Sequence, residues 1–499
     1  MHGGALWLTA ASLWHGVSGF LIYVVAARLM PAAGFGTMTV VMAVALATEV
    51  VLIQGLPRGL AWMLPRMLTA GKAPSNAEQL TRARHLVRAM FLASHAMAAM
   101  LLLAYAAAMQ PMTWMMGQPD LLPLLLLAGA DFLAFAGYVI HLAVFNGLQR
   151  YRTQALVMMG YSTLKALAVL GLLAWQPAPG WGVAGYVLGS LLGTVLAGAT
   201  WLLMKPLHPP GGDTPRSPVS PRVSVLPDVA QAWRFGLPMA GFAIAMAVWL
   251  NADLVVAKAI LPPHLAGHYA GASQVARMVF FVFIAFGEAL FPAVTKAMAQ
   301  QQAALGAAQV QRSLGLLLVL ALPAVALGMT LAAPTLALLF GAEYAAAAPA
   351  LNTLVASAFI LMLVQVLGAV LSAGGQPLLL VRVVAIGAST AVMASLLSGA
   401  VAGGTMSPET LGAWLGAIPG AIAGVIAAVL WRAIRLHMPT LRLPWRGLAL
   451  AAPAAAALWL VAPLAAPGGW WLIPYGAASY AVAVGGALVV GRATSHNKS

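Results

Sequence analysis

The stretches VVAARLMPAAGFG at 24–36 and VVAKAILPPHLAG at 255–267 are similar at a constant offset of 231 residues, with five of thirteen positions identical. In each copy a proline, Pro31 or Pro262, ends an apolar helix, and a glycine, Gly36 or Gly267, permits a tight turn into the next helix. Chance similarity is the alternative in such an apolar sequence. The matching place of both copies in the order of helices favours an internal repeat.

The composition around these stretches is that of an integral membrane protein. Of the 499 residues, 62% are hydrophobic and only 7% are charged, against roughly 25% charged residues in soluble domains. Soluble enzymes, secreted disulfide scaffolds and nucleic-acid-binding proteins are therefore excluded. The formal charge of +15 is carried by basic residues too sparse to form a nucleic-acid-binding face. The chain has no cysteine, which excludes disulfides and thiolate metal sites.

Uninterrupted apolar runs predict fourteen membrane-spanning helices, since about 20 apolar residues cross a bilayer. An even number of predicted helices separates the two repeat copies, so both copies have the same orientation, as in a parallel repeat of two six-helix halves. The fold class is an all-α polytopic membrane protein. The predicted spans lie at about 5–27, 35–56, 89–110, 119–148, 153–175, 181–204, 235–260, 267–294, 313–341, 346–373, 378–400, 410–431, 447–465 and 469–490.

The distribution of Lys and Arg predicts the orientation of these helices. Basic residues favour cytoplasmic loops, and 20 of the 25 basic residues lie in the tails and the even-numbered connections. The connections on the other side, such as 176–180 and 401–409, contain no Lys or Arg. Both termini of this multi-pass protein are therefore expected in the cytoplasm.

The connection at 205–234 carries seven prolines and divides the chain. Proline at this density cannot continue a helix. The sequence predicts an N-terminal lobe of helices 1 to 6, a cytoplasmic linker, a C-terminal lobe of helices 7 to 12, and a last pair of helices with the cytoplasmic tail. A loop that only connects the lobes is the alternative interpretation of the linker. The predicted boundaries are 1–204, 205–234, 235–431 and 432–499.

Nine charged residues lie inside the predicted spans or, for Arg28 and Arg58, just after the end of one. A charge at a helix centre costs roughly 2.5–3.5 kcal/mol on insertion scales, so deep charges should face a cavity or one another. Snorkelling to the headgroups is the alternative for the cations near helix ends, and a buried structural ion pair is the alternative for Lys165 and Arg277. The basic residues are Arg28, Arg58, Lys165, Lys258 and Arg277, and the acidic residues are Glu49, Asp131, Asp253 and Glu288.

The excess of basic over acidic residues in these spans indicates an anionic substrate, which the five basic side chains would bind. The four acidic residues are candidates for binding a coupling proton or sodium ion, with a protonated structural carboxyl group as the alternative. The ten histidines show no metal-ligand spacing. No phosphate-binding glycine loop with a following Lys occurs, so nothing in the sequence suggests direct ATP hydrolysis. We expect no metal, no catalytic residue and no resident cofactor. Glycine ridges at Gly189 and Gly193, and at 416, 420 and 424, indicate close helix packing.

Six stretches carry a resemblance to a known family, and they follow one another over nearly the whole chain. The chain resembles the polysaccharide and O-antigen (oligosaccharide-lipid) flippases of the multidrug/oligosaccharidyl-lipid/polysaccharide exporter superfamily. The stretches are ARLMPAAGFG at 27–36, QGLPRGL at 54–60, NADLVVAKAILPPHLAGHYAGASQVAR at 251–277, EALFPAVTKAM at 288–298, LFGAEYAAAAPALNTL at 339–354 and VLSAGGQP at 370–377.

The resemblance implies two six-helix lobes in a pseudo-twofold V arrangement, with two further C-terminal helices and alternating access. It implies that Arg28, Arg58 and Arg277 hold the pyrophosphate of an undecaprenyl-linked glycan, matched by helix. The hypothesis is a flippase of the bacterial inner membrane that moves this glycolipid to the periplasmic leaflet, with other polysaccharide assembly proteins as expected partners. An ion-coupled drug or metabolite exporter, a membrane-embedded enzyme and a structural role are the alternatives.

Overall fold

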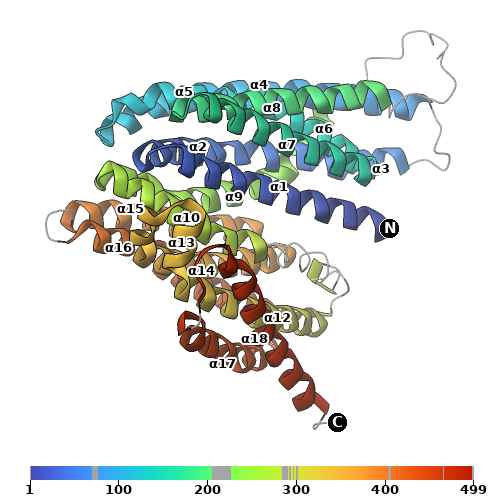
Figure 1. Ribbon diagram of the computed structural model, residues 1–499. Coiled ribbons are helices and arrows are strands. Elements are labelled where there is room, and N and C mark those ends of the chain that lie inside the picture. Colours follow the sequence, from blue (N-terminus) through green and yellow to red (C-terminus); the bar gives the residue numbers. More distant parts are fainter. Residues whose placement is uncertain are drawn as a thin grey trace. The chain divides into compact units, whose positions relative to one another are not determined.

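The computed structural model describes residues 2–69, 77–204, 226–283, 290, 294–295, 297–298, 300, 302–402, 406–464 and 466–496. Within this part of the chain all regular secondary structure is helical (Figure 1). Among the described residues, thirteen helices are long and apolar enough to cross a membrane. The all-α polytopic fold class predicted from the sequence is therefore confirmed. The eighth predicted span, 267–294, is not among the thirteen: α10 (Pro263–Phe283) covers its first part, and most of the remainder lies outside the described residues.

The chain forms two compact units, and the division between them falls within helices. The first unit comprises residues up to Met30 and Thr37–Ala247, and the second comprises Pro31–Gly36 and the chain from Val248 onward. The first turn of α2 thus belongs to the second unit, and the first part of α9 belongs to the first unit. The lobe boundaries drawn from the proline-rich linker stay a prediction, because residues 205–225 of that linker lie outside the described residues.

The helices of the first unit are α1 (His2–Leu29), α2 (Ala32–Gln54), α3 (Leu56–Thr69), α4 (Ala77–Met115), α5 (Leu122–Gly129), α6 (Asp131–Gly147), α7 (Tyr151–Trp175), α8 (Pro179–Met204) and the first part of α9 (Leu226–Ile260). The helices of the second unit are α10, α12 (Ala303–Thr330), α13 (Ala332–Phe340), α14 (Ala348–Ala373), α15 (Pro377–Ala402), α16 (Pro408–His437), α17 (Trp445–Val461) and α18 (Leu472–His496).

Several helices extend beyond the predicted apolar spans. Helix α4 has 39 residues, which at 1.5 Å per residue is nearly twice the roughly 30 Å of a hydrocarbon core. Its first turns carry Arg82, Arg84 and Arg88, as expected for a helix that continues into water on the basic side of the membrane. Arg82 pairs with Asp228 at the start of α9, with 3.1 Å between Nη2 and Oδ2. This ion pair joins two ends of helices within the first unit.

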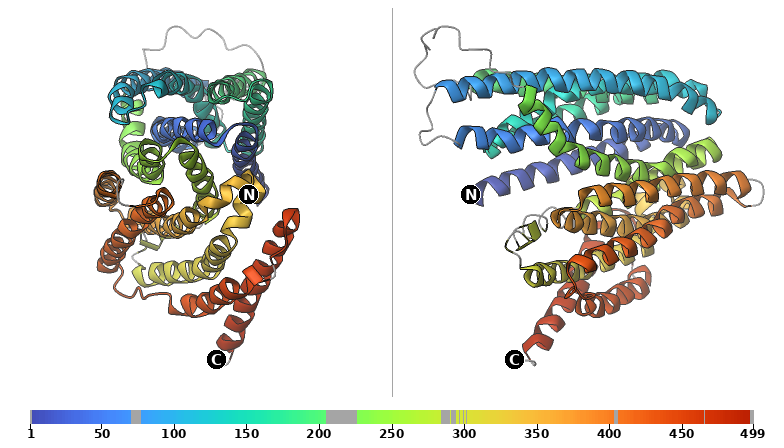
Figure 2. Two further views of the ribbon diagram at one scale, coloured as in Figure 1. Left: turned by 60° about the vertical axis from the view of Figure 1, so that its left-hand side comes forward. Right: turned by 180° about the vertical axis from the view of Figure 1, so that it is seen from behind.

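A glycine ridge on α8 sets the closest helix pair of the first unit. Helices α7 and α8 run side by side, as seen in Figure 1 and in the left view of Figure 2. A Cβ atom at Gly185 would lie 2.6 Å from the Cα atom of Val169, and one at Gly189 would collide with the Cα atom of Lys165. Glycine at every fourth position therefore lets the backbones approach as in other small-residue packing motifs. The close packing predicted for Gly189 and Gly193 is confirmed.

The two copies of the sequence repeat meet each other within the second unit. A Cβ atom at Gly36 would lie 2.9 Å from the Cα atom of Gly267. A Cβ atom at Gly267 would collide with the carbonyl oxygen of Ala32. The first turn of α2 and the start of α10 are thus in backbone contact, with Phe35 also packed on the rings of Phe340 and Tyr344. Glycine at the last position of each repeat copy is required by this contact.

We expect Gly267→Ala to destabilise the protein, because the methyl group would meet a backbone carbonyl group that cannot rotate away. Overpacking of this kind costs about 1–3 kcal/mol. The midpoint of thermal unfolding of the detergent-solubilised protein measures the effect. Gly424→Ala, in the interior of α16 with no atom within 4 Å of its Cβ position, is the control and should not lower the midpoint. Equal midpoints for both variants would contradict the glycine contact.

Gly189→Ala should disturb the α7–α8 pair in the same way, because its methyl group would strike the backbone at Lys165. Gly198→Ala lies on the same helix with open space around the Cβ position and serves as the matched control. The expected result is a lower midpoint of thermal unfolding for the first variant only. A midpoint for Gly189→Ala as high as that of Gly198→Ala would show that α7 and α8 are not held at this spacing.

Candidate functional site

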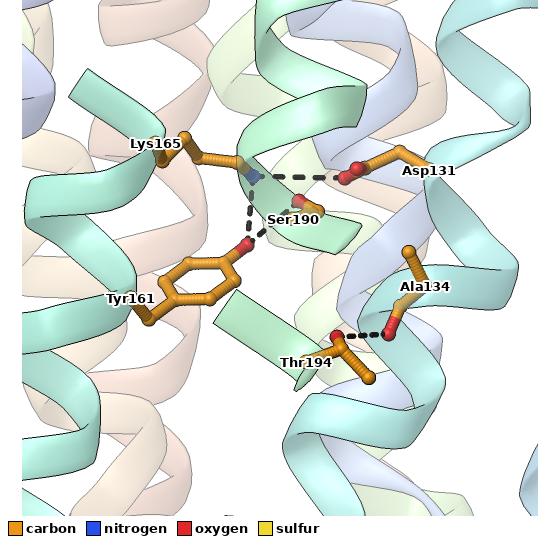
Figure 3. A network of polar contacts seen from close by, with 6 residues as sticks. All are labelled: Asp131, Ala134, Tyr161, Lys165, Ser190 and Thr194. Carbon is orange, nitrogen blue, oxygen red and sulfur yellow. Dashed lines mark hydrogen bonds and ion pairs between the residues drawn. The ribbon is translucent and has the colours of Figure 1, made fainter. Parts of the chain in front are cut away.

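Lys165 lies at the centre of a buried polar cluster in the first unit (Figure 3). Its side chain comes from the middle of α7 and is 5% exposed. The ammonium group donates a hydrogen bond of 2.7 Å to the hydroxyl group of Tyr161, one turn earlier on the same helix. It also lies 3.6 Å from Oδ2 of Asp131 on α6 and 3.2 Å from the ring centroid of Tyr186 on α8. The ammonium charge is therefore met from three helices.

Tyr161 connects Lys165 to α8. Its hydroxyl group lies 3.0 Å from Oγ of Ser190, and its ring stacks on that of Tyr138 with 3.8 Å between centroids. One turn farther along α8, Thr194 donates a hydrogen bond of 2.7 Å to the carbonyl group of Ala134 on α6 (Figure 3). The glycine ridge described above brings α8 close enough to α7 for the contacts of Tyr161. These bonds hold α6, α7 and α8 at fixed spacing around the ammonium group.

The two carboxyl groups of the cluster come from helices that are distant in sequence. Glu49 on α2 and Asp131 at the start of α6 are 2% and 0% exposed. They lie within hydrogen-bonding range of each other, and Lys165 acts electrostatically on Glu49. Among the described residues, Oε1 of Glu49 and both oxygens of Asp131 have no hydrogen-bond partner. We call the six residues Glu49, Asp131, Tyr161, Lys165, Tyr186 and Ser190 the Lys165 cluster.

Helix α1 closes the cluster on another side. Nδ1 of His15 lies 2.7 Å from Oγ of Ser162, which itself donates to the carbonyl group of Met158. The hydroxyl oxygen of Ser162 therefore accepts a hydrogen bond from the Nδ1–H group of His15. Trp14 donates a hydrogen bond of 3.0 Å to Oγ1 of Thr163. These two bonds fasten α1 to α7 beside Lys165.

A second polar cluster lies in the second unit around Arg277 on α10. Tyr269 donates a hydrogen bond of 2.7 Å to Oδ2 of Asp253 on α9, and Asp253 is 3% exposed. The guanidinium group of Arg277 is close enough to act electrostatically on this carboxyl group. Its Nε and Nη2 atoms are buried and have no hydrogen-bond partner among the described residues. We call Asp253, Tyr269 and Arg277 the Arg277 cluster.

The other predicted site residues differ in their exposure. Arg28 is exposed in the last turn of α1, and Arg58 is exposed on α3. Lys258 lies in the last turn of α9 and is 5% exposed. Glu288 lies outside the described residues. Of the five predicted cations, the structure thus places Lys165 and Arg277 in buried polar clusters with acidic residues. The roles assigned to all of these residues stay predictions.

Neither cluster resembles a metal site. The described residues contain no group of three or more His, Asp or Glu side chains that could hold a metal ion. The Lys165 cluster combines two acids with one base, which is an arrangement suited to holding a proton. The Arg277 cluster presents unpaired N–H groups, which is an arrangement suited to binding an anion.

Sequence reasoning missed the tyrosines of both clusters. Tyr161 precedes Lys165 by four residues, which places both side chains on one face of a helix. This four-residue spacing could have indicated from the sequence that Tyr161 lies beside Lys165. Tyr269 lies within the quoted stretch 251–277, but its bond to Asp253 joins two helices and has no signature in the sequence. Tyr186 and Ser190 share the same four-residue spacing on α8, next to Gly189.

Solved structures with a similar fold are membrane transporters. The inward closed conformation of the lipid II flippase MurJ superposes with a TM-score of 0.67 and 10% identity, covering 96% of this chain and 98% of that chain. An inward-facing multidrug resistance MATE family transporter of the MOP superfamily gives 0.66 and 15% identity, covering 88% and 98%. A MOP superfamily transporter from Pyrococcus furiosus gives 0.57 and 17% identity, covering 88% and 96%. At these identities the likeness establishes the fold of the superfamily.

No curated protein matches the chain. A family model described as polysaccharide biosynthesis protein matches residues 2–298, which is more than half of the sequence. The matched residues include all members of the Lys165 cluster and of the Arg277 cluster. With the fold of the exporter superfamily and thirteen helices able to cross a membrane, the chain is a multi-pass membrane protein that belongs to the polysaccharide biosynthesis protein family.

Proposed function

We propose that the protein is a flippase that moves a polyprenyl-pyrophosphate-linked oligosaccharide from the cytoplasmic to the periplasmic leaflet of the bacterial inner membrane, by alternating access and without covalent chemistry. The family match supports a role in polysaccharide biosynthesis, and we propose O-antigen or exopolysaccharide as the product. The similarity in fold to a lipid II flippase supports a lipid-linked glycan as the substrate class. Other polysaccharide assembly proteins are the proposed protein partners.

The guanidinium group of Arg277 is the observation that carries this proposal. Two of its nitrogen atoms are buried without a hydrogen-bond partner among the described residues. Leaving buried donors unpaired is costly, and more so for a charged group. A planar guanidinium group binds phosphate oxygens through two parallel hydrogen bonds, so a pyrophosphate would satisfy both donors. We assign supporting roles in binding this anion to Arg28, Arg58 and Lys258. The sequence predicts the same role for Lys165, but its ammonium group is already met by Asp131 and Tyr161.

Asp253 gives the site a means of release. Its carboxyl group is held by Tyr269 at 2.7 Å and interacts electrostatically with Arg277. When no anion is bound, this carboxyl group partly compensates the guanidinium charge. Asp253 would therefore compete with the pyrophosphate for Arg277. Glu288 and the acidic residues of the Lys165 cluster, Glu49 and Asp131, are proposed alongside it as residues that couple translocation to H⁺ or Na⁺.

We expect Arg277→Ala to block translocation in a strain that depends on this protein. Loss of a charge-assisted phosphate contact costs about 2 kcal/mol or more, which lowers glycolipid binding at least tenfold. The measurement is the amount of polyprenyl-linked oligosaccharide and its accessibility to a membrane-impermeant glycosidase. The intermediate should accumulate and stay protected on the cytoplasmic side. Arg382→Ala, an exposed arginine on α15, is the matched control and should behave as wild type.

The structural likeness to a multidrug resistance transporter supports a second candidate, an ion-coupled exporter of drugs or metabolites. In that case, removing the protein would leave the surface glycan and its lipid-linked precursor unchanged and would increase sensitivity to toxic compounds. Wild-type translocation by Arg277→Ala at normal expression would also remove the support that this residue gives to the flippase.

The proposed orientation places both termini in the cytoplasm, and the absence of cysteine makes it testable with single-cysteine variants. Gln176→Cys lies in the connection after α7, and Thr440→Cys lies in the connection after α16; both positions are exposed. In intact spheroplasts, a membrane-impermeant maleimide should label Gln176→Cys but label Thr440→Cys only after permeabilisation. The opposite pattern would invert the orientation and, with it, the proposed direction of transport.

A further inference from the structure

The Lys165 cluster buries an odd number of charges. Glu49, Asp131 and Lys165 are at most 5% exposed, and they come from three different helices of the first unit. With both carboxyl groups ionised, one ammonium group would leave a net negative charge inside the helix bundle. A buried charge without compensation is strongly unfavourable in an apolar medium. The cluster therefore needs one further positive charge to be neutral.

The position of the missing charge lies between the two carboxyl groups. Glu49 and Asp131 are within hydrogen-bonding range of each other. Ionised carboxylates are acceptors only, so a hydrogen bond between them requires a proton on one of the oxygens. Oε1 of Glu49 and both oxygens of Asp131 lack a hydrogen-bond partner among the described residues, although all are buried. A shared proton would satisfy both carboxyl groups.

A sodium ion fits this position poorly. Hard cations of this kind are held by a shell of several oxygen ligands. On the side of Asp131 that faces α7, the position of a cation is taken by the Lys165 ammonium group, 3.6 Å from the carboxylate oxygen. The rings of Tyr186 and Tyr161 lie around this ammonium group, with centroids at 3.2 and 5.0 Å. A metal cation beside Asp131 would thus meet a fixed positive charge and two rings in place of oxygen ligands.

We propose that the Lys165 cluster is a proton site that binds and releases one proton on the Glu49–Asp131 pair and excludes alkali-metal cations. Lys165 is then the built-in cation that sets this selectivity, and it is a positioning residue for the carboxyl pair. The proton forms an O–H bond on one carboxyl oxygen and is shared with the other, so no further reactant is required. The use of this proton to drive transport rests on the proposed function, but its binding does not.

Titratable groups face the pair from all sides of the cluster and bear on its pH dependence. Lys165 and Tyr161 face it from α7, Tyr186 from α8 and Tyr105 from α4, while His15 on α1 acts on Lys165. The hydroxyl group of Tyr105 is buried without a partner among the described residues. Tyr105 also acts electrostatically on Glu49.

Infrared difference spectroscopy on the purified full-length protein in lipid nanodiscs tests the proposal without any substrate. Spectra are recorded between pH 5 and 9 at constant ionic strength in potassium buffer. We expect a C=O stretching band of one buried carboxylic acid that disappears as the pH rises. Glu49→Gln and Asp131→Asn should each remove this titrating band. Glu409→Gln, an exposed carboxyl group at the start of α16, should leave the band unchanged.

Cation selectivity is measured on the wild-type protein, so this test does not depend on whether a variant folds. Replacing potassium by sodium at fixed pH should shift neither the band nor its titration midpoint. A sodium-dependent loss of the band would overturn the proton site in favour of a sodium site. The absence of any titrating buried acid over this pH range would identify the cluster as a structural ion pair and also overturn the proposal.

The outcome is separable from that of the proposed function. Loss of glycolipid translocation in the depletion strain with the infrared band present would leave both proposals standing. Glycolipid translocation in a protein without the titrating acid would remove the proton site and keep the flippase. If the titrating acid is present but depletion of the protein leaves the lipid-linked glycan unchanged, the proton site stands and the flippase function is contradicted.

Discussion

The ion pair between Lys165 and Asp131 constrains the first unit more than any other contact described. An ammonium group and a carboxyl group that are almost completely buried must lie beside each other, because the apolar surroundings offer neither of them water. The 3.6 Å separation requires α6 and α7 to be neighbours, and the hydrogen bond between the hydroxyl groups of Tyr161 and Ser190 extends the same requirement to α8. Helix packing in a membrane has little hydrophobic drive of its own. Polar contacts of this kind therefore select one arrangement among many that would bury similar apolar area.

Glycine makes that arrangement sterically accessible in each unit. On α8, the glycines at four-residue intervals admit the backbone of α7, and the side chain of Lys165 lies where a larger residue would stand. In the second unit, Gly36 and Gly267 allow the two repeat copies to meet backbone to backbone. Close approach of this kind increases the van der Waals contact on which helix association in membranes depends. One contact thus explains the glycine at the last position of both repeat copies.

Much of the fold could be predicted from the sequence, because the helices of a membrane protein are encoded locally. Apolar runs give the number and position of the spans, and the glycine ridge at Gly189 and Gly193 indicates a close helix pair, independently of what lies next to them. The Lys165 cluster could not be predicted in the same way. Glu49, Asp131 and Lys165 lie far apart in the sequence, and only the packing of three helices brings them together. Sequence reasoning therefore groups Lys165 with Arg277 by charge alone, whereas the contacts of the two side chains differ.

This difference in contacts suggests a division of roles between the two units. The ammonium group of Lys165 has a hydroxyl group, a carboxyl group and an aromatic ring within reach, so its charge is compensated by the protein itself. The guanidinium group of Arg277 keeps two buried N–H groups without a partner in the described part of the chain. Because a buried charged donor without an acceptor is unstable, Arg277 gains from an anionic ligand, while Lys165 would lose its contacts to Asp131 and Tyr161 if it bound one. Under the proposed function, Arg277 is thus the principal residue for the anion, and the carboxyl pair of the Lys165 cluster is the site of the proton.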